Sequence, residues 1–181
     1  MFKYTLLIGI AVILLNGCSG ASFSHKLKDS HDEKRVGIAF DNRNLDLIRV
    51  YPHTGDCINL DDPDNGFTNS AIGFQLMLNN KIENFPEIPE TSVMRREFWV
   101  AAEKKITIRM FAGNGSYRTV TFKPVIGSYY YVTGLMIDPH FPRVLTVYEE
   151  FKTEKGYYDK RLVHDLGLKN CQDGFFRIQN F

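Results

Sequence analysis

The chain has 181 residues and carries 22 Lys and Arg against 21 Asp and Glu, which gives a formal net charge of +1. A nucleic-acid-binding protein would show a basic excess, so this balance argues against that class and we expect no nucleic-acid partner. It also argues against a general attraction of the chain to an anionic membrane surface.

The first residues have the pattern of a secretion signal. Lys3 supplies a positive start, and residues 4–15 are almost wholly apolar. An apolar run of this length matches the roughly 7–15 residues of a signal peptide and is shorter than the ~20 that cross a bilayer. We therefore expect residues 1–17 to be a signal peptide.

The apolar run ends in Leu15-Asn16-Gly17-Cys18, which resembles the lipobox of bacterial lipoproteins. In that family the cysteine thiolate takes a diacylglyceryl group, the peptide is cut before the cysteine, and the new amine is acylated, for instance with palmitate. Two or more acyl chains make a stable membrane anchor. The resemblance implies that Cys18 is lipidated. Ser19 follows it in place of Asp, which implies the outer membrane, and we favour its periplasmic face over the cell surface.

Two cysteines remain once Cys18 is assigned to lipid. Cys57 and Cys171 form an even pair in an oxidising compartment, which predicts a disulfide. Closing so long a loop would contribute up to about 4–5 kcal/mol in the chain-entropy model. Two free thiols are the alternative. A metal site is disfavoured because no ligand spacing accompanies the two cysteines.

The mature chain divides into a tether and one domain. Residues 18–35 are polar and show almost no periodicity, so we interpret them as a lipidated flexible tether. Residues 36–181 are of a length typical of one domain.

Strand-like segments dominate that domain. They cover residues 36–40, 45–51, 71–79, 93–100, 105–111, 117–123, 128–135, 143–151 and 174–181. Only residues 101–104 separate two of these segments, which predicts a hairpin. Tyr158, Leu162 and Leu166 recur at helical spacing before Gly167, which predicts one short helix over residues 157–166.

Short strands separated by turns predict a mostly β fold, either an antiparallel β-sandwich or a small barrel, with one short C-terminal helix. The succession of strands and turns over residues 71–135, ending in residues 127–132 (GSYYYV), resembles small PEGA-like and uncharacterised envelope β-sandwich lipoproteins. This resemblance implies a non-catalytic domain.

An acidic loop offers oxygen ligands. It contains Asp56, Asp61, Asp62, Asp64 and Asn65. A Ca²⁺ site needs about six to eight oxygens in a defined order, and the EF-hand order is absent here. The same residue types are those that turns prefer, so we interpret the loop as structural and expect no metal, with calcium at residues 56–66 as the open alternative.

No catalytic constellation is visible. His53, His140 and His164 lie in the domain, but there is no G-x-S-x-G nucleophile elbow. Residues 113–116 (GNGS) resemble a phosphate-binding loop but lack the following Lys and helix, so we predict a hairpin turn. We therefore expect no catalytic residue, no cofactor and no enzymatic activity.

Two further sets of residues suggest binding surfaces. The first is basic, with seven members in consecutive strands: Arg95, Arg96, Lys104, Lys105, Arg109, Arg118 and Lys123. These residues would form a binding patch for an anionic partner if they share one face of the sheet. The alternative is that they belong to a solvent-exposed surface of mixed charge. The second set is aromatic and comprises Trp99 and residues 129–131. Strand alternation sends Tyr130 opposite to its neighbours, so we expect part of this set to be core.

These observations favour a non-catalytic lipoprotein that is anchored to the membrane through Cys18 and recruits or supports a protein partner in the cell envelope. Two alternatives remain. One is a module that binds glycan or peptidoglycan through aromatic and basic residues. The other is an inhibitor of a cell-wall hydrolase.

Overall fold

The computed structural model of the chain describes residues 26–41, 48–68, 81–87, 91–92, 94–113, 116–134 and 144–171. Cys18 and the strands expected over residues 71–79 and 174–181 lie outside these ranges. The described residues form strands and no helix. The strands are β1 (Arg35–Asp41), β2 (Ile48–Tyr51), β3 (Gly66–Phe67), β4 (Arg95–Ala101), β5 (Ile106–Gly113), β6 (Ser116–Phe122), β7 (Tyr129–Thr133), β8 (Thr146–Lys152) and β9 (Tyr158–Leu162).

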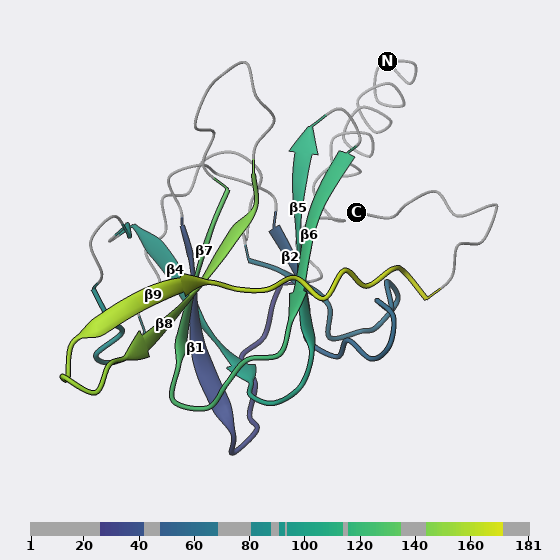
Figure 1. Cartoon of the computed structure of the whole chain (residues 1–181). Helices are drawn as coiled ribbons and strands as arrows, with labels where there is room; N and C mark the ends of the chain where they lie inside the picture. The colour runs from purple at the N-terminus through teal and green to yellow at the C-terminus, as the bar shows by residue number, and fades with distance from the viewer. Residues whose placement is uncertain are drawn as a thin grey trace, which may run out of the picture.

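The strands form two sheets (Figure 1). One has five strands in the order β4-β1-β7-β8-β9, and the other has four in the order β3-β2-β5-β6. Neighbours are antiparallel except β1 and β7, which run parallel. The expected β-sandwich is confirmed, and the described strands do not close into a barrel.

The main core lies between the sheets. Alternate side chains of β1 and β5 face each other across it, and Ile38, Ile106 and Ile108 are fully buried there. Tyr130 of β7 belongs to this core, while Tyr131 faces the opposite side of the same sheet. The alternation expected for residues 129–131 is therefore confirmed.

A second apolar cluster covers the outer face of the five-stranded sheet. Ile82 and Phe85 pack there against Ala39 and Tyr131. Both faces of the central strands are thus covered, which explains why β1 is an almost unbroken buried run rather than an alternating one.

The expected hairpin between β4 and β5 is wrong. β4 pairs with β1 in one sheet, and β5 pairs with β2 and β6 in the other. The short connection therefore passes from one sheet to the other. Its backbone amides donate to residues elsewhere in the chain and not to each other's strands. Ala102 N donates to Lys34 O, and Glu103 N, at a φ of 61°, donates to Pro124 O.

The expected helix over residues 157–166 is also wrong. β9 pairs with β8 along five residues, and the supposed apolar stripe is exposed, with Leu162 at 67 % and Leu166 at 44 %. The chain must run from the edge of one sheet to Cys171 beside the other. An extended segment advances about 3.3 Å per residue against 1.5 Å in a helix, so only the extended form covers that path in few residues.

The predicted disulfide is present. Cys57 and Cys171 are bridged, with their Cα atoms 4.8 Å apart across a sequence separation of 114. Backbone bonds support the bridge on both sides, since Ile58 N donates to Lys169 O and Cys171 N to Ile58 O. The segment after β9 is therefore fastened to the loop that follows β2.

The structure fixes residues 26–34 against the domain, whereas the sequence placed them in the tether. Leu27 is 4 % exposed in the main core, and its amide donates to Phe67 O. Ser30 N donates to Trp99 O. Gly66 makes this approach possible, because a Cβ there would lie 2.3 Å from the backbone N of Leu27.

We predict that Gly66→Ala destabilises the protein by about 1–3 kcal/mol, because the added methyl group displaces Leu27 from the core. Urea unfolding measures the loss, and amide exchange at Leu27 locates it. Gly55→Ala is the matched control, since a Cβ there meets nothing within 4 Å. Equal effects of the two substitutions would contradict the packing of Leu27 over Gly66.

Candidate functional site

The N-terminal segment forms one wall of a cavity of about 360 Å³, which we call the N-terminal groove. Its lining comprises residues 27–32, Pro52, His53, Asp64, residues 99–101 and Lys104. The groove therefore joins the segment that follows the tether to the end of β4 and to the loop after β2.

Charged side chains hold the wall of the groove in place. Asp29 accepts a hydrogen bond from Trp99 N through Oδ1 and pairs with Lys81 through Oδ2 at 2.6 Å. Asp32 pairs with Lys104 Nζ at 2.9 Å. The hydrogen bond from Lys104 lowers the pKa of Asp32, so its carboxylate is charged at neutral pH. The groove thus presents both signs of charge.

Trp99 contributes an aromatic surface at the same place. Its side chain is half-buried, and the Arg35 guanidinium lies 4.8 Å from the ring centroid. Because the cation occupies one face of the ring, Trp99 does not offer two open faces for stacking.

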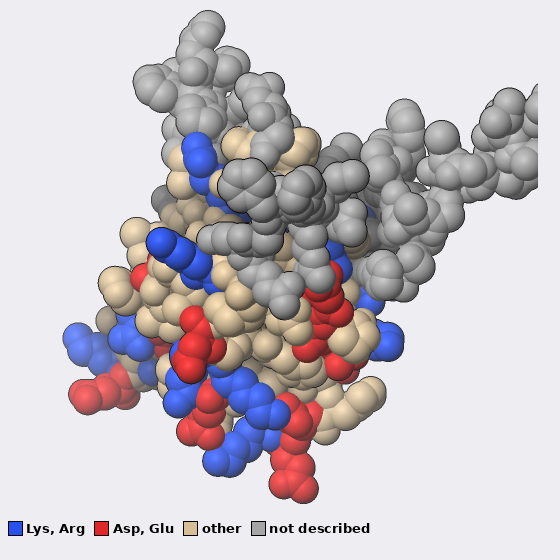
Figure 2. Space-filling model, turned by 90° about the vertical axis from the view of Figure 1, so that its right-hand side faces the viewer, with Lys and Arg blue, Asp and Glu red and all other residues tan. Residues whose placement is uncertain are grey.

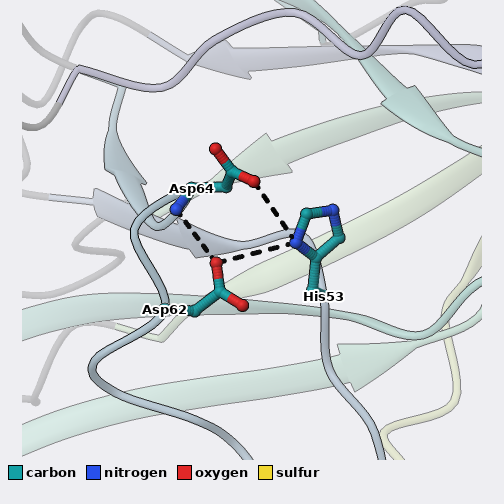
Figure 3. A group of neighbouring side chains, drawn as sticks. All are labelled: His53, Asp62 and Asp64. Carbon is teal, nitrogen blue, oxygen red and sulfur yellow. Dashed lines mark hydrogen bonds and ion pairs between the residues drawn. The ribbon is translucent and has the colours of Figure 1, made fainter.

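Three potential metal ligands meet at the edge of the groove (Figure 3). His53 Nδ1 lies 3.6 Å from Asp62 Oδ1 and 3.6 Å from Asp64 Oδ2. The sequence placed the two aspartates in one loop but did not connect them with His53. Asp62 Oδ1 also accepts the Asp64 amide at 2.9 Å, as in a turn.

This cluster is not preformed for a small divalent cation. Neighbouring ligands around Zn²⁺ are about 3–3.5 Å apart. Here the three ligand atoms extend to 4.8 Å from one another, and His53 and Asp64 are exposed. The three side chains would have to move closer to one another to hold such an ion. The hydrogen bonds within the loop indicate that the loop has a structural role.

A second polar group lies buried on the outer face of the five-stranded sheet. Arg95 Nε donates to Glu97 Oε1 at 2.7 Å, and Glu97 Oε2 accepts the amides of Lys81 and Ile82. Glu97 is fully buried, so its charge is satisfied by one cation and two amides. This carboxylate anchors the covering segment to β4.

Glu150 lies on the same face and is less well satisfied. It is fully buried, and neither carboxylate oxygen has a hydrogen-bond partner. Burial raises the pKa of Glu150 to about 7, although Arg95 and Lys160 oppose the rise. Its neighbour Glu149 behaves in the opposite way. Burial alone would raise the pKa of Glu149, but hydrogen bonds from Arg161 and Ser128 outweigh it and lower that pKa.

The basic residues expected to form a patch are dispersed. Arg95, Arg96 and Arg109 are buried, and the first two lie in a different sheet from the third. Lys104 and Lys105 are tied to separate aspartates. On the face drawn in Figure 2 the two signs of charge intermingle.

The remaining candidates do not converge on one site. His140 lies outside the described residues, and His164 is exposed. Asp165 beside it accepts the amides of Thr121 and Gly167. Gly113 of β5 pairs with Ser116 of β6 in an antiparallel register, which confirms the expected hairpin pairing, and residues 114–115 lie outside the described ranges.

Sequence reasoning missed the groove, the burial of Glu150 and the pairing of two arginines, Arg49 and Arg109. The groove was missed because residues 27–32 show no periodicity. The arginine pair depends on the register between β2 and β5, which a single sequence does not specify.

No family model, no curated protein and no solved structure matches the chain. Within the described ranges, no helix is long and apolar enough to cross a membrane. The functional argument therefore depends on the residues themselves.

We predict that Glu150→Gln removes a pH dependence of stability. A carboxyl whose pKa is raised on folding contributes stability below its unfolded pKa, near 4.5, and that contribution is lost as pH rises through about 7. The variant should be more stable than the wild type at pH 8 by up to about 3 kcal/mol, and the two should converge toward pH 4. Urea unfolding between pH 4 and 8 measures the difference.

Glu149→Gln is the control for that series. Its carboxylate is paired with Arg161, so the substitution should lower stability at pH 8 instead of raising it. If Glu150→Gln lowers stability at pH 8, as Glu149→Gln should, the interpretation that Glu150 is a buried carboxylate without a partner is contradicted.

Proposed function

We propose that the chain is a non-catalytic lipoprotein that is anchored through Cys18 and recruits or supports a protein partner in the cell envelope. The observation that carries the proposal is the Leu15-Asn16-Gly17-Cys18 motif, which ends only eight residues before Lys26. An anchor so close to the domain implies work at the membrane surface.

The length of the tether supports this interpretation. Eight residues span at most about 26–29 Å when fully extended. Residues 26–32 are fixed to the domain and form a wall of the N-terminal groove. The start of that wall therefore stays within this reach of the acylated Cys18. A partner that enters the groove would itself be held near the membrane.

The groove has the chemistry of a protein contact. It combines an exposed ion pair, Asp32 with Lys104, and two histidines, His31 and His53, with the partly buried Trp99. Mixed charges around an aromatic residue are typical of the rim and centre of protein interfaces.

A glycan-binding or peptidoglycan-binding module is the second candidate. Trp99 and Asp64 line the same groove, and an aromatic ring beside carboxylates suits a sugar. The cation of Arg35 over the Trp99 ring reduces the stacking surface, which favours a protein partner. The third candidate is an inhibitor of a cell-wall hydrolase.

We predict that protein extracted from membranes begins at Cys18 and carries acyl chains on it. Intact-mass analysis should show the lipid mass, and limited digestion should place it on the N-terminal peptide. Cys18→Ala should remain uncleaved and lack the added mass. An unmodified Cys18 in the wild type would contradict the anchor.

We predict that crosslinking in cells followed by affinity purification recovers a stoichiometric protein partner. Lys104→Glu should reduce recovery at least fivefold, because it reverses a charge at the groove. Lys155→Glu makes the same change at an exposed position that does not line the groove, and it should leave recovery unchanged.

The same experiment separates the candidate functions. Loss of the partner from Cys18→Ala but not from Lys104→Glu would support the anchor and contradict the groove. Recovery of glycan fragments in place of protein would contradict the recruiting role and favour the second candidate.

A further inference from the structure

Two arginines lie side by side on the outer face of the four-stranded sheet. Arg49 of β2 is directly opposite Arg109 of β5 in the antiparallel register, which brings their Cβ atoms to about 4.5–5.5 Å. Their strand neighbours Ile48, Val50 and Ile108 point into the core, so the two guanidinium groups share the opposite face. Like charges directly opposite each other repel.

Both arginines are more than nine-tenths buried. Arg49 is 8 % exposed and Arg109 is 9 % exposed. The Nε atom of each is enclosed without a hydrogen-bond partner. A buried cation is costly unless it is paired, so this arrangement requires compensation.

The described part of the chain supplies no counter-charge. Among the described residues, neither arginine forms an ion pair with a carboxylate within 4 Å. Arg109 Nη2 donates to Asn170 Oδ1 at 2.6 Å, and Arg109 also interacts with the Tyr51 hydroxyl, so both of these partners are neutral. Within the described ranges no residue accepts a hydrogen bond from the Arg49 side chain, whose Nε is buried without a partner, so its N–H donors can serve a ligand.

Aromatic rings hold the two guanidinium groups in place. Both lie over Tyr51, at 5.4 and 5.3 Å from its centroid. Arg49 also lies over Phe67, and Arg109 over Tyr117, each at 5.3 Å. Burial raises the pKa of Tyr51, although the charges of Arg109 and Arg49 oppose this rise. The Tyr51 hydroxyl is therefore protonated and can donate a hydrogen bond. The donors are fixed before any ligand arrives.

We propose that Arg49 and Arg109 bind a small tetrahedral oxyanion with two negative charges, that is, inorganic phosphate or a phosphomonoester. Two fixed cations match two negative charges, and two planar forks of N–H donors match a group with several equivalent oxygens. A single carboxylate would satisfy one arginine and leave the other unpaired. The site is independent of the N-terminal groove and of the lipid anchor.

The disulfide positions the remaining part of the site. Asn170 precedes Cys171, and the bridge to Cys57 fixes that segment beside the sheet. Figure 1 shows the segment after β9 running across β6 and β5. The anion would therefore bind beside the segment after β9, which the disulfide holds in place.

Titration calorimetry of the full-length protein in detergent, with sodium phosphate at constant ionic strength, tests the proposal. The wild type should bind phosphate, and Arg49→Gln and Arg109→Gln should each weaken binding at least tenfold. Arg118→Gln is the matched control, since it removes the same charge from an exposed position in the same sheet and should leave affinity unchanged. Arg109→Lys keeps the charge but loses the fork, and should also weaken binding.

Thermal unfolding shows that a loss of binding is not a loss of fold. Without phosphate, Arg49→Gln should unfold at the same temperature as the wild type or higher, because a like-charge contact is relieved. Phosphate should raise the unfolding temperature of the wild type and of Arg118→Gln, and should raise that of Arg49→Gln and Arg109→Gln much less. Unfolding of both glutamine variants well below the wild type in phosphate-free buffer would contradict the proposed repulsion.

Glycerol 3-phosphate and acetate complete the experiment. Binding of inorganic phosphate alone identifies a free-anion site, whereas binding of both phosphates identifies a site that admits esters, and either result supports the proposal. No binding at millimolar phosphate, an equal loss with Arg118→Gln, or acetate binding as tight as phosphate would overturn it.

Discussion

The Cys57–Cys171 bridge is the constraint on which the outer surface of the four-stranded sheet depends. It is formed by residues 114 positions apart, and it fastens the segment after β9 to the loop after β2. β9 belongs to the five-stranded sheet, so this segment links the two halves of the sandwich outside the core. Its extended form follows from that path, and Asn170 reaches Arg109 because of it.

The sandwich buries polar side chains outside its apolar core, and the two outer faces do so differently. On the five-stranded sheet, Arg95 and Glu97 neutralise each other, and the carboxylate of Glu97 also receives two amides. On the four-stranded sheet, Arg49 and Arg109 carry the same sign, and the printed partner of Arg109 is the neutral amide of Asn170. The first arrangement is neutralised by described residues, whereas no described carboxylate pairs with the second, and this difference is why we propose a ligand site only for the arginines.

The sequence pattern predicted β1, β2 and β4 to β8 because each carries apolar residues that the sandwich buries, but it missed β3 and β9. The alternation expected for residues 129–131 is present, with Tyr130 in the core, and the even pair of cysteines predicted the disulfide. Sequence periodicity failed where long-range pairing overrode local pattern. The short link between β4 and β5 favours a hairpin locally, but β4 gains more by pairing with the apolar β1. Tyr158 and Leu162 have helical spacing, yet the edge of β8 offers β9 a full ladder of backbone bonds.

The candidate sites were less predictable than the fold, because each depends on residues far apart in the chain. Residues 27–32 looked like a solvated tether, since only one of them is strongly apolar. Leu27 is nevertheless the residue that fixes the segment, and it is accommodated only because Gly66 lacks a side chain. One buried leucine thus converts half of an expected linker into the wall of a groove. If Cys18 is lipidated as we propose, the shortened linker would hold the groove close to the membrane, and the position of Leu27 would then connect the proposed anchor to the proposed partner site.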